Sequence, residues 1–250
     1  MVAVGKDALK DFYERKYQSG TEVPKSSKQF AIALIPPGDG QRVLDVGCGT
    51  GVNSKAIKAL GCRVTGLDIS EAAIAQYVKA GMTGFVCDVE TGLPPHEHKF
   101  DVIFCSEVLE HLIDPLSTLK RLQDVLVDDG QLILTVPNSA FWLYRVAAVL
   151  GYPCNELQHP KHLQFFSRRS LTRVMEQSGF ADLKVSGRNM YAILPDWIPS
   201  FARGLAVGLG WTPEVRFTTK KRFWHFSTYS HFGTSLFADT LIVVARKGKR

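Results

Sequence analysis

The stretch VLDVGCGTG, from Val43 to Gly51, constrains the fold more than any other part of the chain. Residues suited to a buried strand lead into a segment in which Gly47, Gly49 and Gly51 alternate with other residues. Glycine adopts backbone angles that other residues avoid, and it lets a ligand approach the main chain. A helix that follows such a turn also offers N–H groups at its N-terminus. The stretch therefore predicts a strand, a tight turn and a helix that bind a nucleotide-like ligand.

Short apolar runs alternate with helix-like segments along the rest of the chain. The strand-like runs, rich in Val, Ile and Leu, lie at 42–46, 63–67, 83–87, 101–106, 131–136, 182–187 and 238–246. Helix-like patterns lie at 51–61, 70–81, 115–127 and 170–178. Strands separated by helices predict βαβ units and a mostly parallel sheet. We expect a single domain over 1–250, an α/β fold with a doubly wound, seven-stranded sheet.

Two segments, 139–166 and 189–235, depart from this alternation and are unusually apolar or aromatic. Both follow strands whose carboxyl ends should face a ligand. We expect them to be insertions that form a lid or bind the substrate. They could also dip into a membrane surface, or pack on each other as a small subdomain.

Composition places the chain among ordinary globular proteins. It has no run of about 18 apolar residues, and its first residues are too charged for a signal-peptide core. Its five cysteines include no CxxC pair, which favours free thiols in a reducing cytoplasm. We therefore expect a cytoplasmic protein, with peripheral membrane contact as an extension of that prediction.

The positive charge is concentrated near the C-terminus. Residues 216–250 hold eight Lys or Arg and one acid, a net charge of +7, whereas the whole chain carries +6. Such a segment could meet anionic lipid or nucleic acid, or could simply be a solvated face. No RNA-binding module is visible, so nucleic acid is not the expected partner.

Three acids lie near the ends of three successive predicted strands. Asp68 ends the second strand, 21 residues after Gly47, where a carboxylate can accept hydrogen bonds from ribose hydroxyls. Asp88 follows the third strand and could accept from an adenine amino group, and Asp45 lies in the first strand. Each acid alone could cap a turn. Together they suit a ligand with a ribose and an amine, and they would repel a pyrophosphate.

These motifs together resemble the class I S-adenosylmethionine-dependent methyltransferases, in particular small-molecule O-methyltransferases of the ubiquinone-biosynthesis and polysaccharide-modification type. The resemblance is carried by VLDVGCGTG, GLDIS, CDVE, FDVIFCSEVLEHL and LILTVPN. It implies a Rossmann-like fold whose last strand inserts antiparallel, with S-adenosyl-L-methionine as the cofactor.

The resemblance also implies a set of cofactor-binding residues. The N-terminal cap helix region, 1–30, is expected to cover the methionine carboxylate, and the glycine-rich turn holds the methionine end of the cofactor. The acids and apolar residues after the next two strands hold the ribose and adenine. The residues concerned are Tyr13, Tyr17, Asp45, Gly47, Cys48, Gly49, Asp68, Ile69, Asp88, Val89, Ser106 and Glu107.

The stretch SEVLEHL is the richest source of catalytic groups. Glu107, Glu110 and His111 would share one face if Glu107 opened a helix. A neutral imidazole at position 111 could act as a general base near pH 7. The same three residues could instead bind a divalent metal, with His162 completing the site, or could only shape the cofactor pocket. By the resemblance, His162 lies near the acceptor.

The predicted function is O-methylation of a small or lipid-linked acceptor by in-line methyl transfer. N-methylation of an amino sugar or another small amine is the alternative. An RNA methyltransferase, an NAD-linked dehydrogenase and a non-catalytic cofactor-binding protein are weaker alternatives. The sequence leaves the oligomeric state open.

Overall fold

The computed structural model describes residues 6–19, 28–36, 38, 40–95, 98–195, 212–218, 221–230 and 234–248. Its strands are β1 (Arg42–Val46), β2 (Arg63–Asp68), β3 (Thr83–Val86), β4 (Phe100–Ser106), β5 (Leu126–Pro137), β6 (Phe180–Pro195), β7 (Thr212–Thr218), β8 (Lys221–Ser230) and β9 (Ala238–Lys247). Its helices are α1 (Lys6–Gln18), α2 (Gln29–Ile32), α3 (Val52–Lys58), α4 (Glu71–Lys79), the 3-10 turn η1 (Leu109–His111), α5 (Pro115–Asp124), α6 (Trp142–Val149), α7 (Cys154–Leu157), α8 (Arg168–Gln177) and α10 (Thr234–Phe237).

One sheet contains all the strands of the described residues, in the order β3-β2-β1-β4-β5-β9-β6-β8-β7. The seven predicted strands are all present, as β1 to β6 and β9. Strands β1 to β5 pair in parallel, and β9 runs antiparallel to both β5 and β6. The doubly wound fold and the antiparallel last strand are therefore confirmed.

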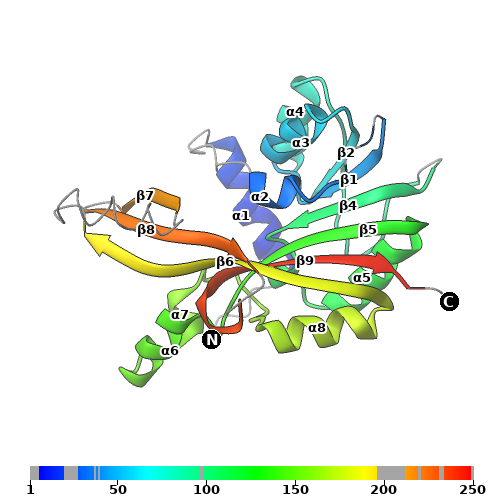
Figure 1. The fold of residues 1–250 in the computed structure, drawn as a ribbon. Helices are drawn as coiled ribbons and strands as arrows, with labels where there is room; N and C mark the ends of the chain where they lie inside the picture. The colour runs from blue at the N-terminus through cyan, green and yellow to red at the C-terminus, as the bar shows by residue number, and fades with distance from the viewer. Residues whose placement is uncertain are drawn as a thin grey trace.

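The sheet is wider than predicted by two strands, β7 and β8. Both lie within 189–235, a segment without the Val- and Ile-rich runs on which strand prediction rests. Asn189 is the last residue of β6 that pairs with β9. Strand β6 continues beyond it, and its final residues pair with β8 alone. As a result β6 and β8 project past the carboxyl ends of β4 and β5, to the left in Figure 1.

The centre of the sheet is buried on both faces. One apolar cluster packs Leu132 of β5 against Leu119 of α5 and Leu171 of α8. The next residue of β5, Ile133, packs in a second cluster that includes Ile57 of α3. Neighbouring residues of one strand thus enter different layers, because side chains of a strand alternate between its faces.

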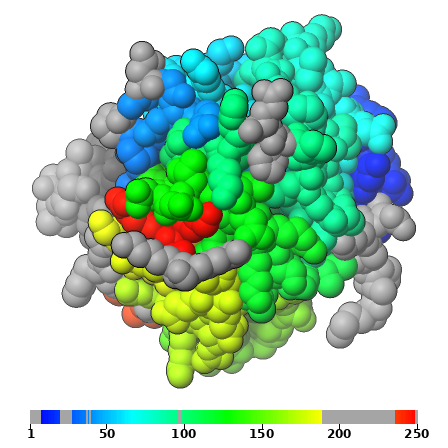
Figure 2. Space-filling view, turned by 90° about the vertical axis from the view of Figure 1, so that its right-hand side faces the viewer, coloured from blue at the N-terminus to red at the C-terminus, as the bar shows by residue number. Residues whose placement is uncertain are grey.

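An ion pair joins β1 to β4 at the amino end of the sheet. Arg42, the first residue of β1, bonds Asp101 of β4 through its backbone N–H at 2.8 Å and its guanidinium at 3.0 and 3.1 Å. The guanidinium holds the pKa of the Asp101 carboxyl below its usual range. Figure 2 shows this end of the molecule, where blue and cyan segments of the N-terminal half lie above green and yellow segments. The parallel strands β1 to β5 point away from it, toward the opposite edge, and β9 points toward it.

Side-chain caps define where several helices begin. Ser70 caps α4 by accepting a hydrogen bond from the N–H of Ala73, and the helix is followed by Gly81, at a φ of +77°. Helix α8 begins at Arg168, two residues before the predicted start. The reason is a capping box, in which Ser167 is the N-cap and Ser170 its partner in the first turn.

Candidate active site

The glycine-rich turn joins β1 to α3, as predicted, but the space left by its missing side chains is used by the protein itself. Gly47 and Gly49 have φ values of +73° and +53°, which favour glycine. A Cβ on Gly47 would collide with Val108, and one on Gly49 would lie 2.8 Å from the hydroxyl oxygen of Tyr17. The turn therefore lets α1 and the segment after β4 close in on the backbone.

A cavity of about 190 Å³ opens beside this turn, at the carboxyl edge of the sheet. Its wall includes residues of α1, of the turn, and of the ends of β2, β3 and β4. All but one of the predicted cofactor-binding residues line it: Tyr13, Tyr17, Gly47, Cys48, Gly49, Asp68, Ile69, Asp88, Val89, Ser106 and Glu107. His111 lines it as well.

Asp68 presents a fixed carboxylate to this cavity. One oxygen accepts from the N–H of Gly49 at 2.9 Å, and the other accepts from the N–H of Ser70 at 2.9 Å. Burial raises the pKa of the carboxyl, while these two backbone donors favour its charged form. Lone pairs remain on both oxygens, so the group can still accept hydrogen bonds from a ligand.

Asp45 is the predicted cofactor-binding residue that the structure does not bring to the cavity. Its side chain is 1% exposed and accepts a hydrogen bond from the hydroxyl of Ser54, which in turn accepts from Tyr77 at 2.9 Å. Burial raises the pKa of Asp45 to about 7. The strand register turns this side chain into the layer behind the glycine-rich turn.

The far wall of the cavity combines an acid with apolar side chains. Asp88 accepts a hydrogen bond from the N–H of Glu90 at 2.9 Å, which orients its carboxylate. Ile69 follows Asp68 and Val89 follows Asp88, and both line the cavity. This wall has the composition expected for one that binds a flat ring with an exocyclic amine.

Glu107 does not open a helix, so the condition under which it would share one face with Glu110 and His111 is not met. Its φ is +58°, in the left-handed region that residues with a Cβ rarely adopt, and η1 begins two residues later. Its carboxylate accepts from the hydroxyl of Thr135 at 3.1 Å and lies 3.5 Å from the ammonium of Lys28. Glu107 is thereby directed to the cavity and away from Glu110 and His111.

His111 is held between two oxygen atoms. Its Nδ1 lies 3.0 Å from the carbonyl oxygen of Lys161, and its Nε2 lies 3.1 Å from the hydroxyl oxygen of Tyr13. A carbonyl oxygen can only accept, so in the neutral ring Nδ1 carries the proton and Nε2 carries a lone pair. This is the tautomer that a general base at the cavity wall requires.

His162 packs against His111 but does not line the cavity. The two rings are edge to face, with centroids 4.9 Å apart, and Nδ1 of His162 lies 3.1 Å from the side-chain oxygen of Gln158. Glu110, which is 1% exposed, completes a group with the two histidines in which the nearest ligand atoms all lie within 4.8 Å of one another. Of the four residues named for a possible metal site, Glu110, His111 and His162 therefore lie together, and Glu107 is not part of their group.

Two lysines that line the cavity, Lys16 and Lys28, were not predicted from the sequence. Lys16 lies on α1 with its Nζ 5.3 and 5.1 Å from the ring centroids of Tyr13 and Tyr17, and Lys28 pairs with Glu107. The helical spacing of Tyr13, Lys16 and Tyr17 was a usable signal for Lys16. Lys28 had no such signal, because it precedes a helix of only four residues.

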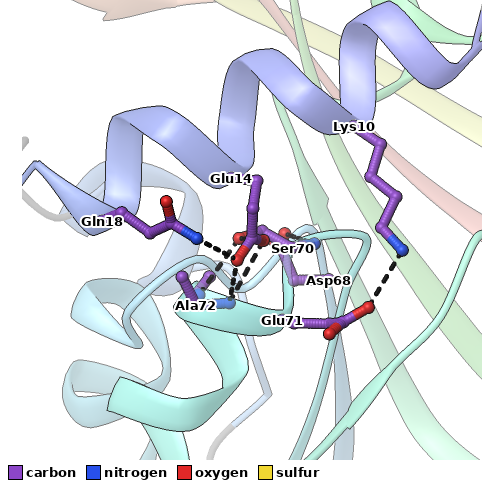
Figure 3. A network of polar contacts seen from close by, with 8 residues as sticks. Lys10, Glu14, Gln18, Asp68, Ser70, Glu71 and Ala72 are labelled. Carbon is purple, nitrogen blue, oxygen red and sulfur yellow. Dashed lines mark hydrogen bonds and ion pairs between the residues drawn. The ribbon is translucent and has the colours of Figure 1, made fainter.

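A further missed residue, Glu14, fastens α1 to the body (Figure 3). Its carboxylate accepts from the hydroxyl of Ser70 at 2.7 Å and from the N–H of Ala72 at 3.1 Å. The Ser70 hydroxyl holds the pKa of Glu14 below its usual range. Lys10, one turn earlier, pairs with Glu71 at 3.1 Å.

A buried carboxylate at the end of the second strand, beside a turn at the carboxyl edge, is the nucleoside-binding arrangement of doubly wound α/β proteins. Residues 15–185, more than half of the chain, match the family model of the methyltransferase domain. The chain belongs to this family and is a class I S-adenosylmethionine-dependent methyltransferase. The match decides against the dehydrogenase alternative.

Two curated relatives illustrate the similarity. The ubiquinone biosynthesis O-methyltransferase of Aromatoleum aromaticum is 32% identical over 158 residues, which cover 59% of this chain and 67% of that relative. The enzyme of the same description from Coxiella burnetii is 33% identical over 158 residues, with the same coverage.

Solved structures support the fold. A SAM-dependent methyltransferase from Thermotoga maritima matches with a TM-score of 0.60 at 20% identity, covering 95% of each chain. A Burkholderia thailandensis 1,6-didemethyltoxoflavin-N1-methyltransferase with bound S-adenosylhomocysteine matches with a TM-score of 0.57 at 18% identity, covering 96% of this chain and 88% of that one.

Proposed function

We propose that the protein methylates a hydroxyl oxygen, most suitably a phenol, on a small or lipid-linked acceptor, with His111 as the general base. The observation that carries the proposal is the tautomer of His111, a cavity-lining residue whose Nε2 carries the lone pair, beside the hydroxyl of Tyr13, while Nδ1–H is held by the carbonyl of Lys161. The names of the curated relatives agree with O-methylation.

The residues around the cavity fit S-adenosyl-L-methionine. Asp68 would bind the ribose hydroxyls, Asp88 would accept from the adenine amine, and Ile69 and Val89 would contact the ring faces. The turn at Gly47–Gly49, with Ser106 and Glu107, would hold the methionine end. Asp45 would support this turn from behind.

The two lysines suit the remaining charge of the cofactor. Its methionine carboxylate needs a cation, and Lys16 and Lys28 both line the cavity, Lys16 beside the rings of Tyr13 and Tyr17. When bound, the cofactor supplies a methyl group on a positively charged sulfur. The protein's part is to align the acceptor oxygen and to take up its proton.

The test is His111→Gln, assayed with S-adenosylmethionine and catechol as a simple phenolic acceptor. We expect the methyl-transfer rate to fall by about 10²- to 10³-fold, since general-base catalysis contributes in that range. Cofactor affinity by calorimetry should stay within about threefold. His98→Gln, at an exposed histidine, is the matched control. An undiminished rate in His111→Gln would remove the base from the mechanism.

A divalent metal at Glu110, His111 and His162 is a second candidate for the same region, favoured by the closeness of their ligand atoms. Such a metal would polarise the acceptor oxygen as a Lewis acid. The measurement is calorimetric titration of Mg²⁺, Mn²⁺ and Zn²⁺ into wild type and Glu110→Gln, together with activity after exhaustive chelation. Full activity in the chelated protein would count against the metal.

We also propose that the acceptor approaches from a membrane surface, with the protein itself in the cytoplasm. Among the described residues, no helix is long and apolar enough to cross a membrane. Helix α6 and the residues after it expose Val146, Val149, Leu150 and Tyr152 by 51%, 87%, 71% and 58%. Segments 139–166 and 189–235 would then enclose the acceptor.

Liposome co-sedimentation tests this part of the proposal. The double substitution of Val149→Asp and Leu150→Asp should reduce binding to vesicles of anionic lipid, because it places charges in the apolar surface. Its activity toward a soluble phenol should be retained. Equal sedimentation of both proteins would rule out this surface as the contact.

A further inference from the structure

Tyr13 occupies the only lone pair that His111 can offer as a base. The Nδ1–H of His111 is committed to the carbonyl of Lys161, so the hydroxyl of Tyr13 must be the donor to Nε2 in the neutral ring. The lone pairs of the Tyr13 oxygen are then left for other partners. Because Tyr13 and His111 both line the cavity, an acceptor hydroxyl can reach the base by donating to Tyr13.

We infer that Tyr13 is a catalytic residue that relays the proton of the acceptor hydroxyl to His111. The inference rests on the proposed role of His111 as the base. The sequence predicted only that Tyr13 helps to cover the cofactor. The relay gives this residue a catalytic role as well.

The relay balances without a charged tyrosine. The acceptor O–H bond breaks and its proton passes to the Tyr13 oxygen, while the Tyr13 proton passes to Nε2 of His111. The acceptor oxygen forms a bond to the methyl carbon, and the electron pair of the broken carbon–sulfur bond stays with sulfur. The positive charge thus moves from sulfur to the imidazolium, and Tyr13 ends as a neutral phenol.

Tyr13 is held in place by contacts around its ring. Phe12 packs edge to face at a centroid distance of 5.3 Å, Tyr17 stacks at 6.4 Å, and the ammonium of Lys16 lies over the ring. The helix that carries it is fastened by Glu14 at the next position and by the close approach of Tyr17 to Gly49. Moving Tyr13 away from His111 would break several of these contacts, whereas a relay needs no movement.

The relay requires a protonated phenol at Tyr13. A phenolate would be unable to donate to Nε2. The neutral form is the one that can both accept a proton and give one up.

The experiment compares wild type with Tyr13→Phe, which keeps the ring and removes the hydroxyl. Single-turnover methylation of catechol is measured at saturating S-adenosylmethionine, in mixtures of H₂O and D₂O. We expect the variant to be about 10- to 100-fold slower, and the dependence of the rate on deuterium fraction to change from curved, for two protons in flight, to linear, for one.

Tyr17→Phe is the matched control, because it removes a hydroxyl from the same helix face one turn away. It should keep the curved dependence, whatever its effect on cofactor binding. A linear dependence in wild type, or an unchanged rate in Tyr13→Phe, would overturn the relay. Loss of activity in His111→Gln without loss in Tyr13→Phe would leave the proposed base intact and refute Tyr13 alone.

A readout without catalysis tests the resting geometry. In the cofactor-free protein, the ¹⁵N resonance of Nε2 of His111 should move in Tyr13→Phe toward the value of a nitrogen that accepts no hydrogen bond. The resonance of Nδ1 should keep its protonated position. An Nε2 resonance that does not respond to the substitution would refute the hydrogen bond and the relay with it.

Discussion

The carboxylate of Glu14 on α1 accepts a hydrogen bond from the hydroxyl of Ser70 at 2.7 Å, at the N-terminus of α4. The backbone N–H of the same Ser70 donates to Asp68, the acid at the cavity. One residue therefore connects the helix that covers the cofactor cavity to the carboxylate at its base. The position also favours an acid, because a helix N-terminus carries partial positive charge.

We predict that Glu14→Ala weakens S-adenosylmethionine binding by about tenfold, since it removes charge-assisted hydrogen bonds that hold α1 over the cavity. Calorimetry measures the affinity. Lys10→Ala is the control, because it removes an exposed ion pair between the same two helices, and such pairs contribute little. Equal effects of the two substitutions would show that Glu14 has no special part in closing the cavity.

Asp68→Asn should reduce cofactor affinity by about 30- to 100-fold, because the amide group turns one acceptor oxygen into a donor that faces either a backbone N–H or the ribose. The binding isotherm is the measurement, with thermal unfolding to verify the fold. Glu71→Gln, three residues along and outside the cavity lining, should bind as wild type does. Unchanged affinity in Asp68→Asn would contradict the ribose assignment.

Gly49→Ala should destabilise the protein by about 1–3 kcal/mol and weaken cofactor binding, since its Cβ would lie 2.8 Å from the Tyr17 hydroxyl oxygen. Gly81→Ala is the control: it too has a positive φ, of +77°, but a Cβ there meets nothing within 4 Å. Tyr17→Phe in the Gly49→Ala background removes the colliding atom and should restore part of the loss. No recovery in the double variant would mean that backbone strain alone explains the defect.

Asp45 should make stability fall as the pH rises. A carboxyl whose pKa is raised in the folded state, here from 3.8 to about 7, favours the fold most when it is protonated. Its unfavourable effect grows between those two pH values and is complete above pH 7. Asp45→Asn should therefore raise the free energy of unfolding at pH 8 by roughly 1–4 kcal/mol, with little gain near pH 4. Urea unfolding at the two pH values measures it, and an equal change at both would contradict the cause given.

The parallel part of the sheet could be predicted because the local sequence of each strand indicates a strand. The run RVLDV is apolar and leads into glycines, and Ser70 marks the start of α4 by its own side chain. Asp68 could likewise be placed at the cavity, because its position follows from the end of β2.

The features of the site that the sequence did not predict depend largely on contacts between distant segments. Glu14 meets Ser70 across 56 positions, and no local pattern announces such a pairing. Glu107 would have shared a face with Glu110 and His111 only in a helix, and the left-handed φ of its backbone prevents that helix. Its absence from the group of Glu110, His111 and His162 follows from this local backbone conformation.

The position of β9 has a consequence for how the protein is made. Residues 238–247 form the last strand of the sheet to leave the ribosome, yet they lie between β5 and β6, which are synthesised earlier. Until they emerge, β5 and β6 each present an open edge that can pair with another chain. The sheet can therefore close only after Lys247 has left the ribosome, and a nascent chain stalled before Ala238 would be a natural client for a chaperone.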